Sequence, residues 1–278
     1  MSVEALPYTL LLLLGQFTAG CAIVTLAVQI RGSFEASFVR ICSWLTLAGA
    51  ALALLTVAAI QPRAAIDGFA LDTGALDPLR AGAVALLLFS LVYALALRRE
   101  EDAFLAHAAG ATTAALGMAI LVLMTKLVQE PTWSVAGAFL SILAGSLTLG
   151  VVVIAMIWGH WYLVNPRLAA RPLNEMTLLT LGAVIAETAV TALNAAMPVG
   201  QHVASNALLA IALPENPAFW LRVGIGLLFP GVLAYLAYRS SAEGAMMSAT
   251  GLLYIAVGAV LAGEALGRGL LFVTGAPV

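Results

Sequence analysis

The sequence predicts an all-α integral membrane protein, a polytopic bundle of eight transmembrane helices. Three observations predict this fold class. Of the 278 residues, 63% are hydrophobic and 9% are charged, whereas soluble domains carry roughly 25% charged residues. The mean hydropathy is +1.05, so polar side chains are too few to cover a surface that faces water on all sides. The apolar residues also fall into eight long runs separated by short polar segments.

Each run is long enough to cross the hydrocarbon core, which takes about 20 mostly apolar residues in a helix. No positively charged segment precedes the first run, so we interpret it as a retained helix rather than a signal peptide. We treat the whole chain, 1–278, as one transmembrane domain. The predicted spans cover about 7–30, 37–61, 79–97, 103–127, 133–163, 173–197, 217–238 and 246–268.

The connections between successive spans alternate between the two sides of the membrane. Four short connections share one side, which we call side B. Both termini and two longer connections, 62–78 and 198–216, share the other side, which we call side A. The stretch ALLAIAL in the second long connection is too short to span, so we expect an interfacial or re-entrant turn there.

Basic residues near the helix ends set the expected orientation, because cytoplasmic connections carry more of them. Side B holds seven such residues and side A holds five. We therefore expect side B to face the cytoplasm of a bacterial inner membrane and both termini to lie outside. Those on side B are Arg31, Arg40, Arg98, Arg99, Arg167, Arg171 and Arg239, and those on side A are Arg63, Arg80, Lys126, Arg222 and Arg268.

Two sets of similar residues, each found once in the first four spans and once in the last four, suggest that the chain consists of two four-helix halves in parallel orientation. GQFTAG at 15–20 and GSLTLG at 145–150 share two glycines and a threonine at the same spacing in the first and fifth spans. Gly110 and Gly117 in the fourth span are matched by Gly251 and Gly258 in the eighth. The alternative is ordinary small-residue packing, which lets membrane helices approach closely.

Glu187 is the main candidate for chemistry, because an ionisable group within a membrane helix is costly and usually functional. Thr191 and Asn194 follow it at helical spacing, so the three share one face that leads toward side A. This face is expected to be a proton path or the wall of a ligand site. The alternative is a protonated carboxylic acid that bonds across helices.

Other charged residues are expected near the side A ends of the spans. Glu264 in the eighth span can pair with Arg222 in the seventh or with Arg268 four residues on. A structural ion pair with snorkelling arginines is one interpretation, and a polar chamber open to side A is the other. Pro230 is expected to kink the seventh span. The chamber would gather Lys126, Glu187, Asn194, Arg222 and Glu264.

The segment IWGHWYLVNPRL at 157–168 places His160, Trp161 and Tyr162 at the side B end of the fifth span. His107 is expected at a similar depth in the fourth span. These histidines are candidates for contacting a quinone, with an ordinary aromatic belt as the alternative. Haem b is not expected, since three histidines, with His202 in a loop, cannot ligate two bis-histidine haems. No metal site is expected, and Cys21 and Cys42 are interpreted as packing residues.

Three functions remain open from the sequence, besides that of a membrane enzyme that acts on lipid. The first is a quinone-binding membrane subunit of a respiratory or other electron-transfer complex that anchors a metal-bearing partner. In outline, this resembles the eight-helix anchors of the polysulfide reductase type, at the level of architecture alone. The second is a small-solute transporter, and the third is a structural or lipid-binding subunit. The expected partners are lipids and other subunits, and a net charge of -2 without a basic run argues against nucleic acid. If the chain takes part in catalysis, it does so as the quinone-reactive subunit of an oxidoreductase, because no hydrolase motif is present.

Overall fold

The structure, a computed structural model that describes residues 3–98, 103–165, 168–198 and 212–278, confirms the predicted fold class. Within these described ranges, eight helical segments are long and apolar enough to span a membrane. The seventh span is built from three consecutive elements. The helices are α1 (Leu6–Arg31), α2 (Ala36–Ala59), α3 (Leu76–Ala96), α4 (Ala103–Val128), α5 (Val135–Val164), α6 (Arg171–Ala196), α7 (Pro217–Leu221), η3 (Arg222–Leu228), α8 (Phe229–Ala242) and α9 (Met246–Thr274).

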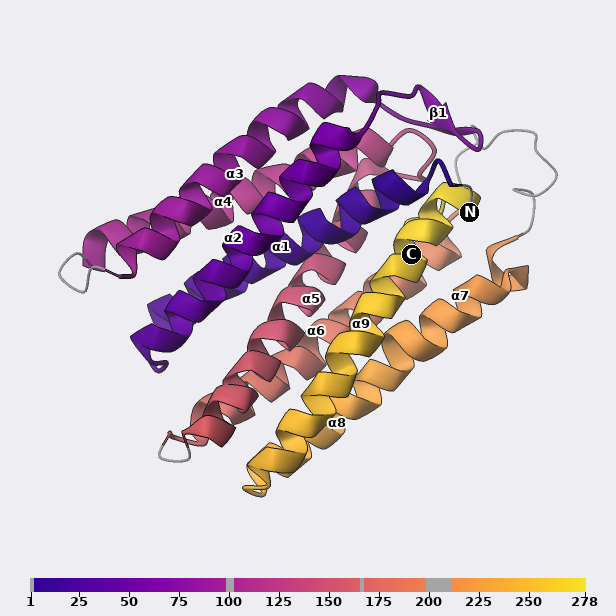
Figure 1. The fold of residues 1–278 in the computed structure, drawn as a ribbon. Helices are drawn as coiled ribbons and strands as arrows, with labels where there is room; N and C mark the ends of the chain where they lie inside the picture. The colour runs from indigo at the N-terminus through magenta and orange to yellow at the C-terminus, as the bar shows by residue number, and fades with distance from the viewer. Residues whose placement is uncertain (1–2, 99–102, 166–167, 199–211) are drawn as a thin grey trace.

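Figure 1 shows the helix ends that the four short connections join at one end of the bundle, and the beginning of α1 and the end of α9 at the other, as the alternating connections predict. The side A connection 62–78 forms a small antiparallel hairpin of β1 (Ala65–Ile66) and β2 (Phe69–Ala70), followed by the turn η1 (Thr73–Ala75). In the other side A connection, η2 (Leu213–Glu215) leads into the seventh span. The expected re-entrant turn at ALLAIAL falls outside the described residues.

The spans are grouped into two rings of four. In the first bundle, α1 packs against α2 and α4, and α3 packs against the same two helices. In the second bundle, α5 packs against α6 and α9, and the seventh span packs against the same two. The main contact between the bundles is α1 against α5, flanked by α4 against α5 and by α1 against α9. Each contact in the first bundle thus has its counterpart in the second.

The α1–α5 crossing joins residues that are 130 positions apart in the sequence. Gly20 and Gly150 lie in direct backbone contact, and a Cβ on either one would overlap the other helix. Ser146 donates a hydrogen bond to the carbonyl oxygen of Gln16 at 2.8 Å. Residues 130 positions apart hold equivalent places in the two halves. Such equivalent residues meet when two parallel helices are related by a two-fold axis along the membrane normal. The packing therefore supports two parallel four-helix halves.

The glycines of the fourth span and their proposed counterparts in the eighth lie in different environments. A Cβ on Gly117 would meet the backbone of Ala19, whereas nothing lies within 4 Å of the same atom on Gly258. The Gly110 and Gly251 positions differ in the same way, because only Gly110 is crowded, by Tyr93. The resemblance between the halves therefore lies in the helix arrangement and in the α1–α5 crossing.

The seventh span departs from α-helical geometry in its side A half. The seven residues of η3 form a π-helix, and the N–H of Phe229 bonds back five residues to the carbonyl of Gly224. Pro230, which cannot donate a backbone hydrogen bond, follows directly. The widened turns therefore stand next to the expected proline kink. Such π-helical turns often mark functional sites.

The eighth span extends six residues beyond its predicted end at 268, because α9 continues to Thr274. Gly275 then ends the helix with a φ of 72°, which favours glycine. The last residues fold against the second bundle, where Ala276 and Val278 are buried. Arg268 consequently lies inside the bundle rather than at the membrane boundary.

Candidate functional site

Four charged side chains meet in the side A half of the second bundle and form what we call the ionic cluster: Glu187 from α6, Arg222 from η3, and Glu264 and Arg268 from α9. Their side chains are between 0% and 3% exposed. Two carboxylates face two guanidinium groups, so the cluster is charge-balanced. This arrangement limits the cost of placing ionisable groups in the membrane.

Arg222 lies at the centre of the ionic cluster. Its Nη2 donates to Oε1 of Glu264 at 2.7 Å and also to Oε1 of Glu187. One guanidinium nitrogen therefore bridges two carboxylates that come from different helices. Arg222 is 1% exposed and does not snorkel to the lipid headgroups. The snorkelling interpretation of this residue is therefore wrong.

Glu264 connects the ionic cluster to the first bundle. Its Oε2 accepts a hydrogen bond from Nε2 of Gln16 in α1 at 2.9 Å and one from Nη2 of Arg268 at 3.2 Å. Gln16 also donates to the carbonyl oxygen of Ile142 at 3.0 Å. Arg268, completely buried, reaches the hydroxyl of Ser141 in α5 at 3.1 Å. The cluster thus ties together five spans from both bundles: α1, α5, α6, the seventh span and α9.

Glycines make room for the Arg222 side chain. A Cβ on Gly226 or Gly263 would lie 2.9 Å from Nη1 of Arg222, and one on Gly267 would lie 3.1 Å from its Nε. Gly145 in α5 likewise makes room for the Glu264 carboxylate, because a Cβ on Gly145 would overlap that carboxylate. These glycines are necessary because α9, η3 and α5 approach closely around bulky charged groups.

Several polar atoms in the ionic cluster and on the adjoining Gln16 have no hydrogen-bond partner among the described residues. They are Nε and Nη1 of Arg222, Nε of Arg268 and Oε1 of Gln16. A buried donor without an acceptor costs about 1–3 kcal/mol. The ionic cluster therefore has unused capacity to bind an oxygen atom or to rearrange its hydrogen bonds.

The corresponding place in the first bundle is apolar. When residues 130 positions apart are treated as equivalent, Leu11 and Gly15 of α1 correspond to Ser141 and Gly145 of α5. Gly15 faces Met124 and Ile120 of α4, whereas Gly145 faces Glu264 of α9. The rest of the first-bundle position is filled by Ala53, Val57, Leu79, Ala83 and Leu86. This architecture can therefore be packed without charges at that position.

Asn194 forms a separate polar contact nearer to side A. It accepts a hydrogen bond from Trp133 Nε1 at 2.9 Å and donates to the carbonyl oxygens of Gly137 and Pro277 at 3.1 and 2.7 Å. Thr191 lies between Asn194 and Glu187 on the same buried face of α6. Asn194 thus fastens the end of the chain over the side A end of the second bundle.

Lys126 is not part of this region. It lies on α4 in the first bundle, where its Nζ is 3.9 Å from Oδ2 of Asp72, and its side chain is 53% exposed. Of the five residues expected to form a polar chamber, the structure brings together Glu187, Arg222 and Glu264. Asn194 lies on the same helix as Glu187, two turns away, and Lys126 lies apart.

The side B histidines have separate partners. His107 Nδ1 is 2.7 Å from the carbonyl oxygen of Ala103 in its own helix, and His160 Nδ1 is 2.9 Å from the Tyr254 hydroxyl on α9. Trp161 donates to Glu35 at 3.1 Å, and the half-buried Tyr162 packs against a hydrophobic core to which both bundles contribute. These contacts are typical of an interfacial belt. Within the described ranges, no three potential metal ligands gather.

An apolar groove of about 600 Å³ runs along the outside of the second bundle, between α6 and the seventh span. Thr188, next to Glu187, lines it, and so do Leu227 and Leu228 at the end of η3. Its volume is within the range of small-molecule sites, about 300–1,000 Å³. The other lining residues are Leu181, Val184, Ile185, Ala189, Ala192, Gly231, Val232 and Tyr235.

Sequence reasoning did not find two members of the site, Gln16 and Ser141. The only signal for Gln16 is an amide in the middle of an otherwise apolar run. Comparison of the chain with known protein families, with curated proteins and with solved structures found no match.

Proposed function

We propose that this chain is the quinone-reactive membrane subunit of a respiratory or other electron-transfer complex, which binds quinone beside the ionic cluster and anchors a metal-bearing partner. The observation that carries the proposal is the difference between the two bundles. The first bundle fills the position of the cluster with apolar side chains, so the charges in the second are not needed for packing. Burying charged side chains within the membrane is energetically unfavourable, so charges that packing does not need indicate a functional role.

The groove between α6 and the seventh span supports a lipophilic ligand. It faces the bilayer and is lined almost entirely by apolar side chains. Thr188 lines the groove, and the preceding residue, Glu187, lies about 100° around α6 and belongs to the ionic cluster. Val184, three residues before Glu187, also lines the groove. A quinone in the groove would thus lie beside the part of α6 that carries this carboxylate, whose polar face leads to side A.

In this proposal, Glu187 carries the proton that quinone chemistry takes up or releases, and Arg222 and Glu264 hold it in place. Redox chemistry on the bound quinone would be supplied by the quinone and the partner's metal centres. The residues of this chain bind the ligand and move the proton. His107, His160, Trp161 and Tyr162 on side B are left to contact lipid headgroups or a partner subunit.

Quinone content tests the proposal directly. Chain purified from membranes in a mild detergent should retain near-stoichiometric isoprenoid quinone, measured by solvent extraction and chromatography. Ala189→Trp places a bulky side chain in the groove and should remove the quinone. Ala115→Trp, on the exposed face of α4 in the first bundle, is the matched control. Equal quinone in all three proteins, or none in the parent, would contradict the proposal.

We further propose a location in the bacterial inner membrane, with side B in the cytoplasm and both termini outside. The excess of arginines on side B supports this orientation. Single cysteines at Ser33 on side B and Ala64 on side A, in a Cys21→Ser/Cys42→Ser background, test it in intact cells. A membrane-impermeant thiol reagent should label position 64 alone. Labelling of position 33 alone would invert the orientation.

A small-solute transporter is the second candidate, and the π-helical segment η3 favours it. Interrupted helices beside midplane polar residues are common where transporters bind their substrates. A cysteine at Thr191, between the ionic cluster and side A, separates the two candidates. Alternating access predicts that thiol reagents reach it from each side in turn. The quinone proposal predicts no reaction from side B.

A further inference from the structure

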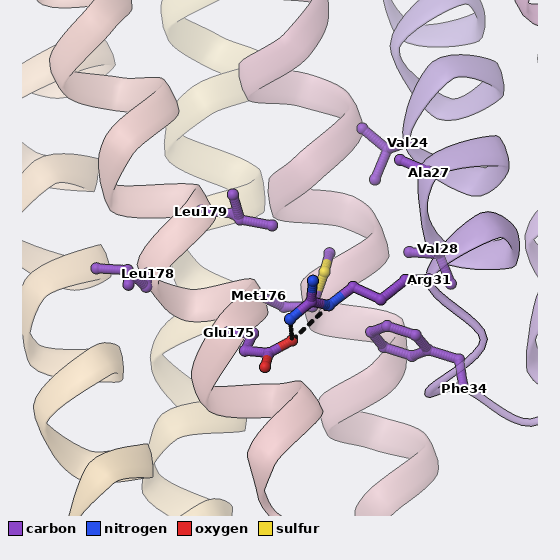
Figure 2. A pocket seen from close by; sticks show the side chains of 9 residues that line it. All are labelled: Val24, Ala27, Val28, Arg31, Phe34, Glu175, Met176, Leu178 and Leu179. Carbon is purple, nitrogen blue, oxygen red and sulfur yellow. Dashed lines mark hydrogen bonds and ion pairs between the residues drawn. The ribbon is translucent and has the colours of Figure 1, made fainter.

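A second groove lies on side B, between the two bundles. It has a volume of about 280 Å³ and runs between the end of α1 and the beginning of α6. Figure 2 shows apolar side chains along its walls and the Arg31–Glu175 ion pair at its side B end. The walls are formed by Val24, Ala27 and Val28 on one side and by Met176, Leu178 and Leu179 on the other.

The side B rim of this groove carries more positive than negative charge. Arg31 and Arg171 share one carboxylate: Nη2 of Arg31 is 2.8 Å from Oε2 of Glu175, and Nε of Arg171 is 2.8 Å from Oε1. Both carboxylate oxygens are therefore engaged. Among the described residues, Arg171 contacts Glu175 through Nε alone, which leaves its two Nη groups available. A further cavity of about 230 Å³ adjoins these residues.

The N-terminus of α6 adds to this preference for an anion. Arg171 is the first residue of α6, and the N-cap, Ala170, has no side chain that can accept a hydrogen bond from the first turn. Pro172 has no N–H, so the N–H groups of Arg171 and Leu173 are the donors of the first turn that lack a side-chain cap, and this helix end favours negative charge. Arg31, at the end of α1, has its side chain 55% exposed, and Arg171 has 83%. Because the rim stands at the ends of two spanning helices, we place it at the depth of the lipid phosphates.

We propose that this groove binds one anionic glycerophospholipid. Its phosphate is held by Arg31 and Arg171, and one acyl chain lies between α1 and α6. From Val24 to Arg31 the groove follows about 10 Å of helix, which matches an acyl segment rather than a whole chain. The lipid fills the side B end of the boundary between the bundles, where it contacts both halves.

Native mass spectrometry of the delipidated full chain tests this proposal. The probes are phosphatidylglycerol and phosphatidylcholine with identical acyl chains, offered in equal amounts. One phosphatidylglycerol should be retained selectively. Arg171→Gln should weaken its binding about fivefold, as expected for one arginine at an anionic headgroup. Glu175→Gln should strengthen it, because that carboxylate competes for the arginines. Ala27→Trp should abolish it by filling the groove.

Arg239→Gln is the matched control. Arg239 also lies on side B, also pairs with a glutamate four residues on, Glu243, and is also more than half exposed. It should bind lipid like the parent. The proposal fails if the two phospholipids bind equally, if Arg239→Gln and Arg171→Gln have the same effect, or if a neutral quinone is the molecule that Ala27→Trp removes. Displacement of the lipid by glycerol phosphate alone would assign the rim to a soluble anion instead.

Discussion

Ser146 donates a hydrogen bond to the carbonyl oxygen of Gln16 at 2.8 Å, and the two residues hold corresponding positions in the two bundles. The contact lies one turn from Gly20 and Gly150, where the backbones of α1 and α5 touch. A hydrogen bond between corresponding residues indicates that the pseudo-two-fold axis passes through this crossing. The same Gln16 reaches Glu264 with its side chain, so the crossing also supports the ionic cluster.

Gly20→Ala should destabilise the protein by about 2 kcal/mol, because its Cβ would overlap the carbonyl oxygen of Ser146. Gly182→Ala in α6 is the control, since nothing lies within 4 Å of a Cβ there. Titration with SDS in mixed micelles measures the free energy of unfolding. Equal stability of the two variants would show that α1 and α5 do not depend on backbone contact.

Gln16→Leu should lower the free energy of unfolding by about 2 kcal/mol, because Oε2 of Glu264 loses a donor. Gln16→Glu should cost more, since it adds a third carboxylate to the buried cluster. Gln29→Leu, elsewhere on α1, is a comparison in which no charged group loses a partner. The order of the three midpoints in the same SDS titration is the readout, and a larger loss for Gln29→Leu would contradict the assignment.

Arg222→Met should be the most damaging single change in the cluster, at about 4 kcal/mol, because it leaves two buried carboxylates without their shared donor. Removing Glu187 as well, in Glu187→Leu/Arg222→Met, leaves Glu264 balanced by Arg268. The double variant should therefore be more stable than the sum of the two single losses predicts. Additive losses would mean that the side chains do not interact in the folded protein.

The sequence was sufficient to locate the spans because each has a long apolar run, and its rare charges identified Glu187, Arg222 and Glu264. The partners of these groups were harder to predict. Gln16 and Glu264 are 248 positions apart and meet only because α1 crosses α5 at Gly20. Lys126 was assigned to the same end of the molecule correctly, but the sequence does not say that it lies in the other bundle, beside Asp72.

The places where the backbone departs from the predicted helices also could not be derived from the sequence. Pro230 indicates a kink, yet the seven π-helical residues that precede it depend on how Gly226 packs against Gly263. The end of α9 was predicted six residues early because Arg268 resembles a boundary residue. Its burial depends on Ser141 and Glu264, which offer oxygen acceptors inside the bundle.

Glu187→Gln tests the role of this carboxyl in proton transfer. The amide oxygen can still accept the hydrogen bond from Arg222, so the chain should fold and assemble with its partner subunits. It cannot carry a proton, so quinone-linked turnover of the purified complex with decylubiquinol should fall at least about tenfold, about 1.4 kcal/mol of barrier. Thr180→Ser, a conservative change on α6 outside the groove and the ionic cluster, is the control. Unchanged turnover in assembled Glu187→Gln would assign the carboxyl to packing.

The difference between the bundles leads to the most demanding test, which is to give the second bundle the apolar composition of the first. Glu187→Val, Arg222→Leu, Glu264→Ile and Arg268→Met are combined in one chain. In the first bundle, Val57, Ile120 and Met124 occupy this region without loss of packing. Replacing a complete buried ion network by apolar groups of similar size is often neutral or stabilising.

We therefore expect the fourfold variant to elute as a single species and to resist SDS at least as well as Arg222→Met. Gln16 keeps its bond to the Ile142 carbonyl and loses only the one to Glu264, a cost that is small beside the removal of four buried charges. Ser141 loses Arg268 but can bond within its own helix. Turnover with decylubiquinol should be lost even though the chain still assembles with its partners. A variant that fails to fold while Glu187→Gln works normally would identify the ionic cluster as the structural core of the second bundle.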